Sequence, residues 1–291
     1  MSGGVIWALV AAVGFAFLQV SNRKVNQQLD AFRTAFGLLL AAELVLLCRM
    51  LALGTFEVVS DLTVTAAVYF FLAGFLHFVG GWTLLGLSQQ RIGVARTGAL
   101  VSAAPVIGTL VAAIWLDEPL TGLVIGGVVL ATGGVWLISS SGGGGTDRTW
   151  RRPWLALTVA TIWGTTPLWI RRGLREFDHP VEGLTIGLGL SVIAYGVLLT
   201  LARRWRRGAL PASALRWMLV GGIAGATAVA AQWLSYHLTS IAAAITVQQL
   251  SVLFVLALVP MMFREPFERM DLQVILGAFA LVSGAVLVVM S

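Results

Sequence analysis

The sequence has few charged residues for its length. Only 11% of its 291 residues are Asp, Glu, Lys or Arg, whereas soluble domains average about 25%. Hydrophobic residues make up 58% of the chain, which is more than a soluble protein could shield from water behind a polar surface. The composition therefore excludes an ordinary soluble domain and predicts an integral membrane protein whose solvent is mostly lipid.

Cysteine and histidine are also scarce. The single cysteine, Cys48, excludes an internal disulfide and a cysteine-rich metal site. The three histidines, His77, His179 and His237, lie far apart and lack metal-ligand spacing. No serine elbow or phosphate-binding loop is present either. The sequence therefore predicts no catalytic residue, no metal and no cofactor, and a membrane enzyme is kept only as an alternative.

The net charge of +6 comes almost wholly from arginine. These arginines are divided among short loops between apolar runs, which argues against a nucleic-acid partner. The expected partners are a small-molecule substrate and membrane lipid, and we expect a monomer rather than an obligate oligomer.

Ten apolar segments approach the roughly 20 residues that a membrane span needs. A Ser/Gly/Arg-rich linker at residues 139–153 separates five of them from the other five. The predicted fold is an all-α integral membrane protein with ten transmembrane helices, in two five-helix repeats at residues 1–138 and 154–291. The predicted spans are 3–20, 34–52, 63–86, 93–116, 120–138, 154–171, 182–202, 214–237, 241–262 and 271–290.

The two halves share a duplicated hairpin. Residues 87–138 match residues 234–289, first at an offset of 147 and then, after a four-residue insertion, at an offset of 151. Because each half has an odd number of helices, the halves enter the membrane from opposite sides, and such inverted repeats place substrate at their interface. Small residues favour close helix packing. The glycines predicted to form packing faces are Gly126, Gly127, Gly133, Gly134, Gly277 and Gly284.

The basic residues are unevenly distributed along the chain. The odd-numbered connections hold 15 of the 19 Lys and Arg residues, and the even-numbered connections and termini hold four. Basic loops stay in the cytoplasm. The count therefore predicts both termini outside the cytoplasm, in a prokaryotic inner (plasma) membrane; the reverse orientation is the alternative.

Several short motifs occupy matching places in the two halves. They are Pro105, Asp117-Glu118-Pro119-Leu120-Thr121 and Gly126 in the first half, and Trp163-Gly164, Glu265-Pro266 and Gly277 in the second. With these motifs, the chain resembles the EamA-type transporters of the drug/metabolite transporter superfamily. The resemblance implies a ten-helix inverted-repeat carrier, often an exporter of amino acids or other small metabolites. The chain departs from the pattern at Val13-Gly14, and its first span lacks the glutamate of the four-helix multidrug members.

Glu43 lies near the middle of the second predicted span, among leucines. Ionisable groups at that depth are costly and mark functional sites. Glu43 is therefore a candidate for proton coupling. The alternative is a glutamate that fixes helix packing, either neutral or paired with Arg96 or Arg49.

Aromatic and proline residues mark two further spans. His77 shares a face with small residues and precedes Trp82, so we expect it to line a cavity or to pack against a neighbouring carbonyl. Pro167 removes a helix hydrogen bond and frees the carbonyl of Trp163, while Thr166 can help to satisfy the loosened turn. Helix kinks are predicted at Pro105 and Pro167.

Polar stripes on the eighth and ninth spans should face the interior of the bundle. Glutamine offers donors and acceptors to a polar substrate, although bonding between helices without any ligand is the alternative. The residues predicted to line the substrate cavity are His77, Trp82, Trp163, Thr166, Gln19, Gln232, Tyr236, Gln248 and Gln249.

Glu118 and Glu265 are equivalent residues, each followed by proline. We interpret each as a tight turn whose carboxylate lies near the start of the next helix and is stabilised by its dipole. The alternative is a gate or coupling pair.

The sequence as a whole predicts a secondary-active or facilitative exporter of small polar metabolites, with amino acids favoured, that works by alternating access. The alternative substrates for the same fold are nucleotide sugars, lipid-linked substrates and drugs.

Overall fold

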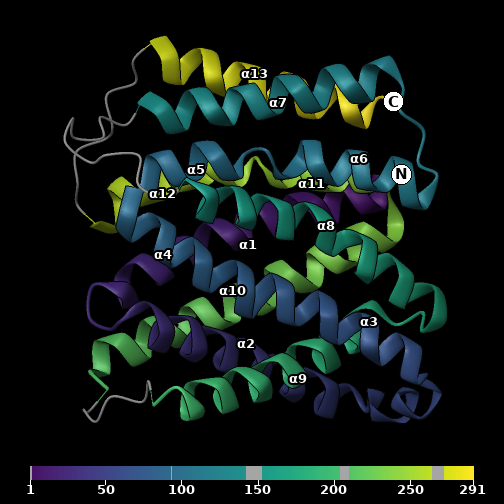
Figure 1. Cartoon of the computed structure of the whole chain (residues 1–291), viewed down its shortest axis with the longest axis vertical. Helices are drawn as coiled ribbons and strands as arrows, with labels where there is room; N and C mark the ends of the chain where they lie inside the picture. The colour runs from purple at the N-terminus through teal and green to yellow at the C-terminus, as the bar shows by residue number, and fades with distance from the viewer. Residues whose placement is uncertain (1, 93, 142–152, 204–209, 264–271) are drawn as a thin grey trace.

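The structure, a computed structural model, describes residues 2–92, 94–141, 153–203, 210–263 and 272–291, and every regular element in these ranges is helical (Figure 1). The elements are α1 (Ser2–Asn26), α2 (Ala31–Leu53), η1 (Thr55–Asp61), α3 (Val64–Gly74), η2 (Phe75–Trp82), α4 (Thr83–Ile92), α5 (Val94–Val101), α6 (Ala104–Leu116), α7 (Gly122–Ser141), α8 (Trp154–Glu176), α9 (Pro180–Leu201), α10 (Ala212–Leu238), α11 (Ile241–Gln248), α12 (Ser251–Phe263) and α13 (Leu272–Val289).

These elements form the ten predicted spans. The third span is α3, η2 and α4 in sequence, the fourth is α5 with α6, and the ninth is α11 with α12. Within the described residues, nine spans are long and apolar enough to cross a membrane. The tenth, α8, has 23 residues but is less apolar because threonines, tryptophans and Pro167 interrupt it. The predicted fold class is confirmed.

The helices lie side by side, with one pair of helices at each end of the long axis of the molecule. The α7–α13 pair occupies one end of the long axis and the α2–α9 pair occupies the other (Figure 1). Both termini lie on the same side of the bundle (Figure 1). We call this side the terminal face; it carries the connections 54–63, 117–121, 177–179 and 239–240.

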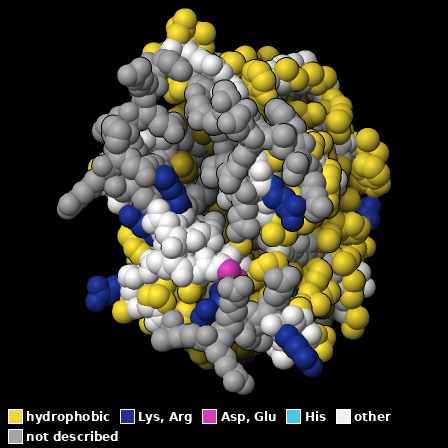
Figure 2. Space-filling model, turned by 60° about the vertical axis from the view of Figure 1, so that its left-hand side comes forward, with side chains coloured by type: hydrophobic (Ala, Val, Ile, Leu, Met, Phe, Trp, Pro, Cys, Tyr) yellow, Lys and Arg dark blue, Asp and Glu magenta, His cyan; other side chains and the backbone are white. Residues whose placement is uncertain are grey.

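The described connection 27–30 lies on the other side, which we call the opposite face (Figure 1). Figure 2 turns this side toward the viewer and shows Lys and Arg side chains on it beside apolar side chains.

The contacts between helices repeat with a two-fold relation between the halves. In one set α10 packs against α1 and α2, and in the equivalent set α3 packs against α8 and α9. The relation holds at the level of residues, because Gly37 lies against Met218 just as Gly183 lies against Phe70. These pairs align α2 with α9 at an offset of 146 and α3 with α10 at an offset of 148. The predicted inverted repeat is therefore present.

The α7–α13 crossing corrects the predicted alignment. A Cβ atom added at Gly134 would lie 2.5 Å from the Gly277 carbonyl oxygen, and one added at Gly284 would lie 2.5 Å from that of Gly127. These contacts are equivalent at an offset of 150, so the insertion has three residues and not four. Gly126 and Gly133 have no such neighbour among the described residues, and the prediction that they pack is wrong.

The fourth and ninth spans are broken at the same place in each repeat. Turns at residues 102–103 separate α5 from α6, and turns at residues 249–250 separate α11 from α12, at the offset of 147. Pro105 stands in the first turn of α6. The equivalent position in the second half is Val252, so the second break forms without proline. It contains hydrogen bonds between residues three apart instead of four, such as Leu250 N to Val247 O at 3.0 Å.

The ends of α2 are fixed by its own sequence. The Asp30 carboxylate accepts hydrogen bonds from the amides of Phe32 and Arg33, each 3.1 Å, which satisfies two amides of the first turn. At the other end Gly54 adopts φ 68°, a left-handed conformation that glycine permits without strain. These two stops set the register of Glu43, midway along α2, against its neighbours.

Candidate functional site

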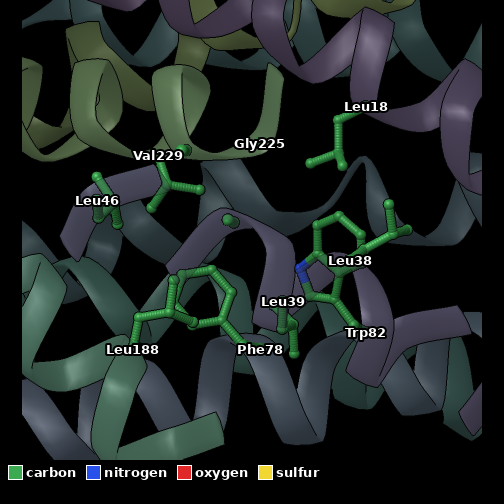
Figure 3. A pocket seen from close by; sticks show the side chains of 11 residues that line it. Leu18, Leu38, Leu39, Leu46, Phe78, Trp82, Leu188, Gly225 and Val229 are labelled. Atoms are coloured by element: carbon green, nitrogen blue, oxygen red, sulfur yellow. The ribbon is translucent and has the colours of Figure 1, made fainter. Parts of the chain in front are cut away.

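A small apolar pocket lies between the two halves. The first half supplies its wall from α1, α2 and η2, and the second half from α9 and α10 (Figure 3). Ala42 and Leu188 both line it, and these residues are equivalent at the offset of 146. The pocket therefore lies at the pseudo-two-fold axis that relates the two halves. Its lining residues are Leu18, Leu38, Leu39, Ala42, Leu46, Phe78, Trp82, Leu188, Gly225, Ala226 and Val229.

Helix periodicity explains why α2 contributes more lining residues than any other helix. Leu39, Ala42 and Leu46 are spaced at three and four residues, so they form one stripe along the helix. Across the pocket lie Gly225 and Ala226 of α10. Because glycine has no side chain and alanine has only a methyl group, they leave space beside the large aromatic side chains of η2.

Glu43 lies next to this stripe and faces α9. Its side chain is buried, with 6% of the residue exposed, and its Oε2 atom has no hydrogen-bond partner among the residues that the structure describes. A Cβ atom on Gly189 would lie 2.9 Å from Oε1, so the glycine provides the space that the carboxylate occupies. Glu43 and Gly189 are equivalent at the offset of 146. The carboxylate therefore lies near the pseudo-two-fold axis, beside the pocket.

The third span contains a π-helix, η2, which the sequence reasoning missed. Phe70 aligns with Met218 at an offset of 148, but Leu87 aligns with Leu234 at 147, so the first half has one extra residue between them. A π-bulge accommodates one inserted residue within a helix. The change of offset was the available signal.

The π-helix brings Trp82 to the pocket. Figure 3 shows its ring in the wall with the indole nitrogen turned toward the space between the labelled side chains. The Nε1 atom is buried and lacks an acceptor within the described part of the chain. A buried indole N–H usually has a partner, so this N–H is an unpaired donor beside the pocket.

The structure brings His77 and Trp163 together. Their rings stack with centroids 5.6 Å apart, and Trp163 Nε1 donates to the His77 carbonyl oxygen at 3.3 Å. A Cβ atom at Gly81 would collide with this indole, so the glycine allows the ring to approach. His77 is buried and stands outside the wall of the pocket. The pair joins η2 to α8, one helix from each half.

Two of the predicted glutamines meet within the second half. Gln232 Nε2 donates to Gln248 Oε1 at 2.8 Å, and Gln248 Nε2 donates to Ser235 Oγ at 3.1 Å. All three side chains are buried. They join α10 to α11 immediately before the break in the ninth span, while the buried Oε1 atom of Gln232 has no partner among the described residues. Tyr236, one turn from Gln232, is also buried.

Gln19 and Gln249 do not line the pocket. Gln19 is exposed on α1, Gln249 is half-buried at the break, and the side chain of Arg96 lies outside the described residues. Pro167 lies inside α8, where Thr166 Oγ1 donates to the Ile162 carbonyl oxygen at 2.7 Å and so supports the turn before it.

Ion pairs between the halves lie on the terminal face. Arg49 on α2 pairs with Glu182 on α9 at 2.8 Å and so is not the partner of Glu43 that the sequence suggested. Arg171 on α8 pairs with Glu118 at 3.4 Å.

Glu118 also corrects an expectation. Its carboxylate accepts from the amide of Ile241, at 2.9 and 3.0 Å, and so caps α11 of the other half instead of the helix that follows its own turn. Its equivalent, Glu265, lies outside the described residues. Among the residues described, no group of three or more His, Cys, Asp or Glu side chains could hold a metal ion.

Two inverted halves around a shared apolar pocket define a membrane carrier. The EamA-like transporter family model matches residues 2–140 and 152–290, one copy on each half. The chain belongs to this family and is an integral membrane transporter of the drug/metabolite type, as the resemblance implied.

Comparison with solved structures shows the same fold. One structure, described only as "Crystal structure of protein", is 15% identical, with a TM-score of 0.76 over 100% of this chain and 97% of that chain. Comparison with curated proteins found no match.

Proposed function

We propose that this chain is a secondary carrier that exports small amino acids, those with apolar side chains above all, by alternating access between its two halves. The observation that supports this most directly is the pocket itself. It is lined by both halves, its wall is aliphatic and aromatic, and its polar neighbours are a buried carboxylate and a free indole N–H.

The chemistry of the wall fits a small molecule with an apolar side chain. Burying such a group against Leu39, Phe78 and Leu188 removes its surface from water, at about 25 cal/mol per Å². The Trp82 N–H can donate to a substrate carboxylate, because an indole is a donor only. Ligand pockets are typically apolar with a few polar groups that fix orientation.

The position of the pocket supports alternating access. Residues at the pseudo-two-fold axis stay between the halves whichever face is open. A substrate bound there can therefore be reached from each side of the membrane in turn. On the terminal face the halves are joined by Arg49–Glu182 and Arg171–Glu118, contacts that opening of that face would have to break. The sequence has no phosphate-binding loop, so a gradient drives uphill transport.

The test is counterflow of radiolabelled amino acids in proteoliposomes. We expect leucine and phenylalanine to exchange, and lysine and glutamate to exchange at least tenfold more slowly. Movement of a nucleotide sugar or a lipid-linked substrate with no amino-acid exchange would replace this proposal with the alternative substrate class. Efflux from preloaded cells checks direction, and net uptake only would contradict export.

One variant tests the role of the indole. Trp82→Phe keeps an aromatic wall but removes the N–H, and the lost hydrogen bond, about 1 kcal/mol, should raise KM about fivefold. The matched control is Trp136→Phe, because Trp136 is 52% exposed on α7, far from the pocket. Equal KM values for the two variants would show that the indole N–H does not bind substrate.

A further inference from the structure

Glu43 differs from the other acidic side chains that join the halves. Glu182 and Glu118 each pair with an arginine near a helix end. Glu43 lies midway along α2, is buried, and takes part in no ion pair or hydrogen bond among the described residues. A buried charged carboxylate without a partner is costly, and Glu43 makes no polar contact that would join the helices and offset this cost.

The groups that face Glu43 leave it isolated. On α9, Glu182 pairs with Arg49 and the hydroxyl of Tyr195 bonds to Thr83 at 2.9 Å. On η2, the ring of His77 stacks on Trp163. At this level α1 and α10 present Leu18, Gly222 and Gly225, and α4 and η1 meet α2 only near its ends.

We propose that Glu43 binds and releases the proton that couples transport to a proton gradient; this rests on the proposed function. A proton needs a single oxygen atom, which Glu43 supplies. A metal cation needs several oxygen ligands, and the nearest lining groups, Leu39, Leu46 and Leu188, are hydrocarbon. Uptake of a proton converts the carboxylate to a neutral acid and removes the charge from the apolar interior.

The position of Glu43 explains how one carboxyl serves both faces. Glu43 lies near the pseudo-two-fold axis, where α2 crosses α9, and it faces its own equivalent residue, Gly189. When the halves rock against each other, this crossing is the boundary between the two access paths. A proton taken up from one face can therefore be released to the other while substrate moves the opposite way.

The first test does not need a substrate. Infrared difference spectra of the purified full-length protein between acidic and alkaline pH should show the C=O stretch of a protonated carboxyl. Glu43→Gln should lose this band and Glu43→Asp should shift it. Glu57→Gln, a change at an exposed glutamate on η1, should keep it. An unchanged band in Glu43→Gln would overturn the proposal even if amino acids are transported.

The second test measures coupling in proteoliposomes whose lumen is one pH unit more acidic than the bath. With the membrane potential held at zero, one proton exchanged per substrate supports about tenfold accumulation. We expect leucine to accumulate about tenfold with the wild type and Glu57→Gln. With Glu43→Gln we expect no accumulation, although counterflow without a pH gradient continues.

Two outcomes of this second test contradict the proposal. Gradient-driven accumulation by Glu43→Gln equal to wild type removes the proton role. Loss of counterflow in Glu43→Gln, but not in Glu43→Asp, with both variants eluting as wild type, assigns the carboxylate to the substrate's ammonium group instead. If no amino acid moves with any variant, the proposed function fails, while the infrared band still decides whether Glu43 takes up a proton.

Discussion

Arg49 and Glu182 form an ion pair of 2.8 Å at the terminal-face end of the α2–α9 crossing, and their equivalents at the other end are Tyr195 and Phe36. The two rings meet edge to face with centroids 6.1 Å apart. The same crossing is therefore fastened by charge at one end and by aromatic contact at the other. Glu43 and Gly189 lie between these two contacts.

The ion pair should couple the two halves measurably but weakly. Arg49 is 37% exposed at its side chain, and exposed pairs contribute about 0.2–1 kcal/mol. A double-mutant cycle with Arg49→Gln and Glu182→Gln, read from unfolding in detergent, should give a coupling in that range. Additive effects of the two changes would show that the pair does not join the halves.

Glu118 should matter more for stability than its neighbour Asp117. Glu118→Ala leaves the Ile241 amide without its acceptor and removes the ion pair of Arg171, which keeps its hydrogen bond to the Thr239 carbonyl oxygen. The change should destabilise the protein by about 1–3 kcal/mol. Asp117→Asn is the matched control, because Asn also tolerates the left-handed backbone, φ 58°, of that position. Equal melting temperatures for the two variants would contradict the cap between the halves.

Adjacent glycines on α7 should respond in opposite ways. Gly134→Ala places a Cβ atom 2.5 Å from the Gly277 carbonyl oxygen, and such overpacking costs about 1–3 kcal/mol. A Cβ atom at Gly133 meets nothing within 4 Å, so Gly133→Ala should be neutral or gain up to about 1 kcal/mol of helix propensity. Thermal unfolding of the two variants checks this directly. A stable Gly134→Ala protein would place the helix crossing elsewhere.

The orientation prediction can be tested on the terminal face. Both termini lie there with the even-numbered connections, and the basic residues are concentrated in the odd-numbered connections. A tag at the C-terminus should therefore react with a membrane-impermeant reagent in intact cells. A tag that reacts only after lysis would establish the reverse orientation.

The sequence was sufficient for the helices and their pairing into halves. Apolar length defines a span regardless of its neighbours, and two copies of one pattern reveal the repeat. The alignment slipped by one residue because Gly126-Gly127 and Gly133-Gly134 are paired glycines. A shift of one residue there keeps a glycine match while turning the helix face by about 100°.

The contacts between halves could not be predicted in the same way. Glu118 caps α11 because the fold brings residue 241 beside residue 118, and no local pattern records that approach. The break at residues 249–250 has no proline to mark it. The buried carboxylate of Glu43 was recognisable from its depth alone, but its position opposite Gly189 required the helix crossing.

The matched breaks in the fourth and ninth spans have a consequence for energetics. A break is present at the same place in both halves. Under the proposed alternating access, the inward-open and outward-open forms would be built from the same two local shapes, exchanged between the halves. Such forms lie close in free energy, and a bias of about 1.4 kcal/mol changes their ratio tenfold. Differences as small as that between the Arg49–Glu182 pair and the Phe36–Tyr195 contact are therefore sufficient to set which form the resting protein adopts.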